Sequence, residues 1–91
     1  MAVLRLATWP VSEEVYDAVV AETRLHTEHP IGLIMHSASH IEGELQVMQV
    51  WDSVEYAVRY EEDVLEPALR SSGVTDPGEV RLYELHDLVT P

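Results

Sequence analysis

The stretch from Pro30 to Trp51, PIGLIMHSASHIEGELQVMQVW, decides the fold. Its two halves, residues 31–39 and 44–51, are rich in β-branched and long apolar side chains, which is typical of strands. Gly43 lies between the halves and indicates a tight turn. The stretch is therefore predicted to form a β-hairpin near the middle of the 91-residue chain.

A strand and a helix are predicted before the hairpin. Residues 3–9 are rich in β-formers and are followed by Pro10, so they predict a strand. Ser12 is placed to cap the free N–H groups of a helix. We expect this helix to end within residues 26–28, because Pro30 blocks its continuation.

A second helix and strand are predicted after the hairpin. The helix begins at residues 52–53 and ends before Gly73, a natural left-handed cap. Pro67 removes a helical hydrogen bond, so a kink or break is expected near residues 63–65. A turn at residues 75–78 leads to a last strand at residues 79–89.

The predicted order is strand, helix, strand, strand, helix, strand. It indicates an α+β, ferredoxin-like antiparallel sheet in a single domain, residues 1–91, with both helices on one face. Residues 44–51 carry apolar side chains on both faces of their strand, including Leu45 and Val47 on one and Met48 and Val50 on the other. Two helices shield one face only, so a second copy of the chain is expected on the other. Arg5, in the first strand, suggests that one face of that strand meets water or a partner.

The charge is strongly unbalanced. Seventeen acidic residues face five arginines, which gives a formal charge of −12. Nucleic acids and anionic membranes need cations on the protein, so neither is expected as a partner. The acidity favours solubility or a basic partner protein. Without cysteine there is no thiol chemistry, and without a signal peptide or long apolar run we expect a cytoplasmic protein.

Two histidines are candidates for catalysis. His36 lies in the middle of an apolar strand, where a pocket histidine could move a proton near neutral pH. His86, in the last strand, is the second candidate. The alternatives are a hydrogen-bonded histidine in the core or dimer face for His36, and a partly exposed one for His86. No metal site is expected: His36 and His40 share a strand face but lie about 13 Å apart.

A pocket between the helices and the sheet would be lined by apolar and aromatic side chains. The expected substrate-binding residues are Trp51, Tyr56, Tyr60, Met35 and Met48. Ordinary core packing is the alternative for each of them. The acidic run Glu61–Asp63, with Glu66 after it, is expected to form a solvated helix face.

Several of these positions together resemble the dimeric α+β barrel superfamily, which includes antibiotic-biosynthesis monooxygenase-like proteins. The chain is most similar to its small uncharacterised actinobacterial members. The resemblance covers nearly the whole chain and rests on Pro30, Gly32, His36, Gly43, the segments Trp51–Glu55 and Leu65–Leu69, and Gly73.

The resemblance implies a homodimer with a pocket in each subunit, and a reaction without metal or cofactor. The superfamily includes oxygenases of aromatic polyketides, haem-degrading enzymes, isomerases and cyclases. We therefore expect oxygenation, isomerisation or cyclisation of a small apolar or aromatic metabolite. The alternatives are a non-catalytic dimeric module that binds a ligand or a protein, and a haem-binding protein. The chain has no asparagine, unlike the sites of the haem-degrading and some oxygenase relatives.

Overall fold

The computed structural model describes residues 1–76 and 78–91. Pro77, in the turn expected at residues 75–78, lies outside the described residues. The elements in chain order are β1 (Val3–Trp9), α1 (Glu13–Thr23), β2 (Leu33–Ile41), β3 (Glu44–Trp51), α2 (Val54–Tyr60), the π-helical turn η1 (Glu61–Leu65), α3 (Glu66–Ser71) and β4 (Glu79–Glu84).

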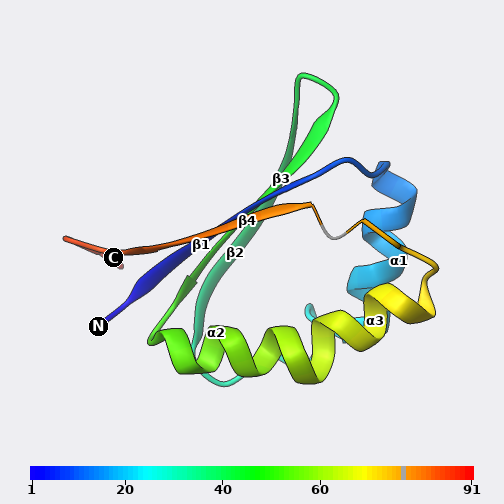
Figure 1. Cartoon of the computed structure of the whole chain (residues 1–91). Helices are drawn as coiled ribbons and strands as arrows, with labels where there is room; N and C mark the ends of the chain where they lie inside the picture. Colours follow the sequence, from blue (N-terminus) through cyan, green and yellow to red (C-terminus); the bar gives the residue numbers. More distant parts are fainter. Residues whose placement is uncertain (77) are drawn as a thin grey trace.

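The four strands form one antiparallel sheet in the order β2-β3-β1-β4. The helix α1 and the long helix made of α2, η1 and α3 lie on the same side of it (Figure 1). The expected α+β, ferredoxin-like architecture is therefore confirmed.

The strands of the hairpin and the first strand form close to where the sequence predicts them. β1 and β3 have the predicted bounds, whereas β2 begins two residues late, at Leu33. The chain still turns at Gly32, where φ is +89° and the Leu33 amide donates to the carbonyl of Pro30. The hairpin turn has only two residues, Glu42 and Gly43, both with positive φ, which is the geometry of a type I′ turn.

Two elements end earlier than predicted. α1 ends at Thr23, because Arg24 adopts a left-handed conformation and its carbonyl then accepts turn hydrogen bonds from the next residues. β4 ends at Glu84 instead of residue 89. Glu84 pairs with Val3, the first residue of β1, and beyond that pair the amide of Leu85 donates one hydrogen bond to the carbonyl of Ala2.

The long helix does not break before Pro67. Residues Glu61–Leu65 form a π-helical turn, and the amide of Glu66 donates to the carbonyl of Glu61, five residues back. Proline carries no N–H for the preceding turn, and the wider turn accommodates that loss while the helix continues. The expected break is thus replaced by a change in helical phase.

The two faces of the sheet differ in cover. On the helix-facing side, alternate residues of β1 from Val3 to Trp9 are buried, as are Leu45, Val47, Gln49 and Trp51 of β3. The other side, which we call the open face, carries apolar side chains with no helix over them. They include Leu4, Leu6, Met35, Met48, Val50 and Tyr83.

The packing around Trp51 holds α2 against the sheet. Trp51 is fully buried and its ring lies 5.3 Å from that of Tyr60. Tyr56 packs directly against Gly32, where an added Cβ would lie 2.5 Å from the Tyr56 ring. Only glycine suits this position, since its φ is also positive.

Candidate functional site

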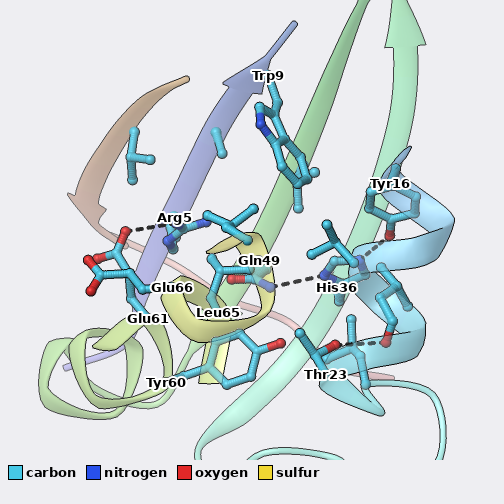
Figure 2. A pocket seen from close by; sticks show the side chains of 17 residues that line it. Arg5, Trp9, Tyr16, Thr23, His36, Gln49, Tyr60, Glu61, Leu65 and Glu66 are labelled. Carbon is cyan, nitrogen blue, oxygen red and sulfur yellow. Dashed lines mark hydrogen bonds and ion pairs between the residues drawn. The ribbon is translucent and has the colours of Figure 1, made fainter. Parts of the chain in front are cut away.

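A cavity of about 80 Å³ lies between the helix-facing side of the sheet and the two helices (Figure 2). Its walls are mostly apolar, with polar groups from Arg5, Tyr16, His36, Gln49 and Glu61. Most lining residues are buried or half-buried, whereas Glu66 is exposed, so we place the mouth of the cavity beside Glu66.

The polar groups of the sheet form one row across three strands. Arg5 of β1 is paired with Gln49 of β3, and Gln49 is paired with His36 of β2. The rows on either side are almost entirely apolar on the helix-facing side, such as Ala7, Val47 and Ala38. Three buried or half-buried polar groups in one row need partners, and each of them has one.

A β-bulge aims His36 into this row. The pairing of β2 with β3 shifts between Leu33 and Met35, so Ile34 is an extra residue. Without the bulge, strict alternation from Leu33 would place Met35 on the helix-facing side and His36 on the open face. Bulges re-aim side chains in this way and are common beside functional sites.

A series of hydrogen bonds determines which ring nitrogen of His36 carries the proton. The Trp51 indole only donates, so the Gln49 atom 3.1 Å away is the amide oxygen. The Gln49 amide nitrogen therefore donates to His36 Nδ1 at 3.0 Å. The ring proton is then on Nε2 and is donated to the Tyr16 hydroxyl, 2.7 Å away. Tyr16 accepts this bond and keeps its own hydrogen to donate elsewhere.

The electrostatics agree with this assignment. Burial lowers the pKa of His36 below its usual value, and the nearby His26 and Arg5 lower it further. Burial raises the pKa of Tyr16, and so do Asp17 and Tyr60. At neutral pH the cavity therefore presents a neutral imidazole and a protonated phenol, both held in place.

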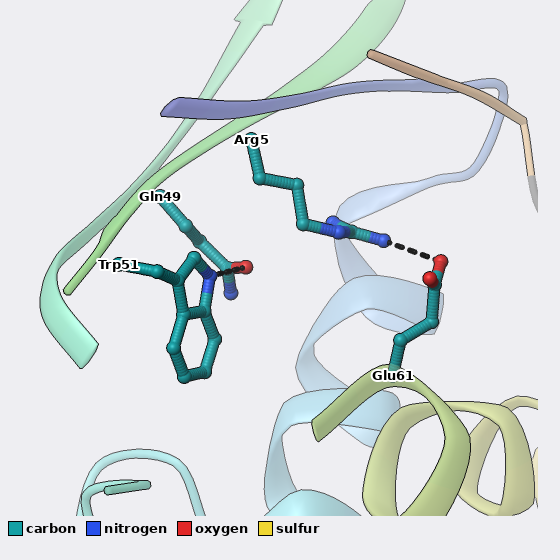
Figure 3. Close-up of polar contacts among 4 residues, drawn as sticks. All are labelled: Arg5, Gln49, Trp51 and Glu61. Carbon is teal, nitrogen blue, oxygen red and sulfur yellow. Dashed lines mark hydrogen bonds and ion pairs between the residues drawn. The ribbon is translucent and has the colours of Figure 1, made fainter. Parts of the chain in front are cut away.

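Arg5 is buried at the other end of the row. Its side chain is only 6% exposed, and its Nη2 lies 3.1 Å from Oε1 of Glu61, on the first turn of η1 (Figure 3). The interpretation that Arg5 marks a strand face in contact with water or a partner is wrong, because Arg5 lies beneath the helices. Of the acidic residues expected on a solvated face, Glu62, Asp63 and Glu66 are exposed, whereas Glu61 is half-buried and lines the cavity.

The structure brings two of the sequence-predicted site residues to the cavity, His36 and Tyr60. The hydroxyl of Tyr60 points towards Thr23 across the cavity (Figure 2). Burial raises the pKa of Tyr60, so this phenol is also protonated at neutral pH.

The other predicted site residues lie elsewhere. Trp51 and Tyr56 belong to the core beside the cavity and do not line it. Met35 and Met48 lie on the open face, on the opposite side of the sheet. His86 lies beyond the end of β4 and is exposed.

Four functional candidates, Arg5, Tyr16, Gln49 and Glu61, were not predicted from the sequence. For Arg5 and Gln49 a signal existed. Each is a single polar residue flanked at i−2 and i+2 by apolar residues of one strand face, as Val3 and Ala7 flank Arg5. Such an interruption on a buried face is typical of a polar group with a specific partner.

Within residues 1–76 and 78–91, no three His, Asp or Glu side chains are grouped so that they could hold a metal ion. No helix of the described part is long and apolar enough to cross a membrane.

Comparison with known proteins gives structural neighbours only. No protein-family model and no curated protein matches the sequence significantly. Rv0793 from Mycobacterium tuberculosis superposes with a TM-score of 0.72 at 16% identity, over 99% of this chain and 100% of that one.

Two further neighbours carry functional names. A candidate antibiotic biosynthesis monooxygenase from Chloroflexus aurantiacus J-10-fl superposes with a TM-score of 0.70 at 11% identity, over 99% of this chain and 98% of that one. A variant of SnoaB, a cofactor-independent oxygenase from Streptomyces nogalater, gives a TM-score of 0.70 at 13% identity over the same shares. The chain therefore has, over its whole length, the fold of antibiotic biosynthesis monooxygenase-like proteins.

Proposed function

We propose that the chain is a small-molecule enzyme of the antibiotic-biosynthesis monooxygenase-like type, which oxygenates, isomerises or cyclises its substrate without metal or flavin. The proposal rests on the series of hydrogen bonds that runs from Trp51 through Gln49 and His36 to Tyr16. It ends in the cavity at the Tyr16 hydroxyl, which still has a hydrogen to donate. A fixed donor of this kind stabilises negative charge that develops on a substrate oxygen.

The roles follow from the hydrogen bonds. Tyr16 is the donor to the substrate, and His36 is the positioning residue that holds it. His36 is not the proton acceptor, because Nδ1 already accepts from Gln49 and Nε2 carries the proton. Tyr60 and the apolar wall orient the substrate.

The size and the apolar walls of the cavity support a small apolar or aromatic substrate. Its volume of about 80 Å³ lies well below the roughly 300–1,000 Å³ of sites for drug-sized ligands. We therefore favour a substrate no larger than a single ring. The residues do not fit a haem, because the volume is too small for a porphyrin and both His36 ring nitrogens are engaged.

Replacement of Tyr16 by Phe tests the role of the hydroxyl. We expect wild-type protein to convert members of a panel of small phenols, hydroquinones and ketones, followed by oxygen uptake and mass spectrometry. Tyr16→Phe should lower kcat by about 100-fold, the effect of losing one fixed donor. Its cost in stability should be only about 1 kcal/mol. Tyr83→Phe, on the open face, is the matched control and should keep wild-type activity.

The small cavity also favours a second candidate, a non-catalytic dimeric module that binds a ligand or a protein. If wild-type protein converts no member of the panel but binds one of them in a calorimetric titration, the enzyme proposal is wrong and the module is supported.

We also propose that the open face pairs with that of a second copy, giving a homodimer. Met35, Met48 and Tyr83 are 39%, 37% and 45% exposed there, next to half-buried Leu4 and Leu6. A contiguous apolar face of this kind on a small domain indicates an interface.

Met48→Glu tests the dimer, because it would place a charge in the centre of the open face. We expect sedimentation to show a monomer for this variant and a dimer for the wild type. Val58→Glu on α2 is the matched control, since Val58 is 38% exposed but does not belong to the sheet. A wild-type monomer, or equal effects of the two variants, would refute the interface.

A further inference from the structure

The π-helical turn changes which residues of the long helix face the cavity. The cavity is lined from this helix by Tyr60, Glu61, Leu65, Glu66 and Leu69. Two pairs in this set, Tyr60 with Leu65 and Glu61 with Glu66, are five residues apart. Residues five apart diverge in an α-helix but lie roughly above one another where the hydrogen bonds run from i to i+5. The π turn therefore brings two carboxylates to one cavity wall.

Arg5 has donors that are not engaged by protein. Among the described residues, its guanidinium has one hydrogen-bond partner, Glu61 Oε1. No buried side-chain nitrogen or oxygen of the described residues lacks a partner. The remaining guanidinium nitrogens are therefore not sealed in protein, and since Arg5 lines the cavity they are open to it. Buried cationic donors facing a cavity suit an oxygen that carries negative charge.

The proton acceptor of the cavity is found by elimination. His36 has both ring nitrogens engaged, and Tyr16 and Tyr60 are protonated phenols at neutral pH. Free lone pairs on titratable groups of the described wall then belong to Glu61 and Glu66. Glu61 is the half-buried one and touches Arg5, whereas Glu66 is exposed.

The charges define the substrate class. Arg5 is offset by Glu61 and Glu66 at the mouth, and the chain carries a formal charge of −12. An anionic substrate is therefore disfavoured on approach. A neutral substrate that becomes anionic during the reaction suits both the acidic mouth and the cationic donors inside.

We propose that the cavity binds a small neutral ketone with an acidic α C–H, that Glu61 takes the proton, and that Arg5 holds the enolate oxygen. The α C–H bond breaks and its proton goes to a Glu61 carboxylate oxygen. The C–H electron pair becomes the C=C bond, and the carbonyl π pair moves onto oxygen. Arg5 thereby exchanges one anionic partner, the carboxylate, for another, the enolate, so no net charge is created in the site.

This inference rests on the proposed enzyme function and deepens it, because enolate formation is a step shared by oxygenation and isomerisation. The step itself consumes no oxygen and is reversible. It is therefore measurable alone, as replacement of α-hydrogens by deuterium in D₂O.

The experiment follows the α-protons of hydroxyacetone and cyclopentanone by NMR under anaerobic conditions. Wild-type protein should accelerate exchange of at least one probe. Glu61→Gln, which still accepts a hydrogen bond from Arg5, should slow that exchange by about 100-fold or more, the usual share of a general base. Glu62→Gln, which changes an exposed carboxylate of the same π turn that does not line the cavity, is the matched control and should exchange at close to the wild-type rate. Wild-type-like circular dichroism spectra and cooperative unfolding above the assay temperature establish that both variants are folded.

The outcomes separate this inference from the proposed function. Exchange that survives Glu61→Gln, or is lost in Glu62→Gln, overturns the assignment of Glu61. Absence of exchange by wild-type protein, with Tyr16-dependent turnover in the wider panel intact, overturns the inference and leaves the proposed function standing. Absence of both overturns both.

Discussion

Glu61→Leu is expected to unfold at a much lower urea concentration than the wild-type chain, whereas Arg5→Met is expected to unfold close to it. The two variants break the same ion pair from opposite ends. Glu61→Leu leaves a guanidinium whose side chain is 6% exposed without its partner, and an uncompensated buried charge costs about 3 kcal/mol. Arg5→Met leaves a carboxylate whose side chain is 35% exposed, which water can solvate.

The measurement is equilibrium unfolding in urea of both single variants and the double variant. Because domains of this size have only about 5–15 kcal/mol of stability, the loss in Glu61→Leu should be plain in the midpoint. The double variant should recover most of it, since no buried charge remains. Glu66→Gln changes an exposed carboxylate on the same helix and should stay within about 0.5 kcal/mol of wild type. Equal losses in the two single variants would show that Arg5 is not effectively buried.

Gln49→Glu is expected to change the tautomer of His36, by moving the ring proton from Nε2 to Nδ1. A carboxylate at position 49 would still accept from the Trp51 indole, but it would also accept from His36 Nδ1 instead of donating to it. The ring proton should move to Nδ1, and the pKa of His36 should rise from below to above its ordinary value of about 6.5.

The contribution of His36 to the free energy of unfolding should change with pH in opposite directions in the wild type and in Gln49→Glu. In the wild type the folded-state pKa of His36 is lowered, so its contribution is present above pH 6.5 and is lost as the pH falls towards the folded value. In Gln49→Glu the folded-state pKa is raised, so the contribution is present below about pH 6.5 and is lost as the pH rises through the new value.

Nitrogen-15 NMR of the imidazole ring measures the tautomer and the pKa directly. Gln46→Glu is the matched control, because it adds the same charge to β3 on the open face. It should leave the His36 tautomer unchanged. An imidazole that keeps its proton on Nε2 in Gln49→Glu would contradict the donor order proposed for the chain.

Local patterns in the sequence were enough for the architecture. Apolar runs, the Gly43 turn and the prolines predicted the order of elements and the bounds of β1 and β3. These signals are local because the periodicity and the turn residues that predict an element lie within or next to that element. The ends of two elements were predicted less well. The helix α1 stops at the left-handed Arg24, well before Pro30, and the end of β4 depends on where its neighbour β1 begins.

The site depends on relations between distant elements, which explains the errors there. The row of Arg5, Gln49 and His36 exists only through the pairing of three strands. The bulge at Ile34 reverses the alternation of β2, so Met35 lies on the open face while His36 faces the cavity. Glu61 was expected on a solvated face because it begins an acidic run, and its contact with Arg5 of β1 could not be read from that run.

The two tryptophans give the protein a pair of built-in spectroscopic reporters. Trp51 is fully buried and its indole hydrogen is bonded to Gln49, while Trp9, 6% exposed, donates to the backbone carbonyl of Asp76. The indole N–H signal of Trp51 should therefore respond to changes at His36, to which Gln49 connects it, and that of Trp9 to changes in the loop that precedes β4. A single proton spectrum would therefore distinguish an event at the polar row from a general loosening of the fold.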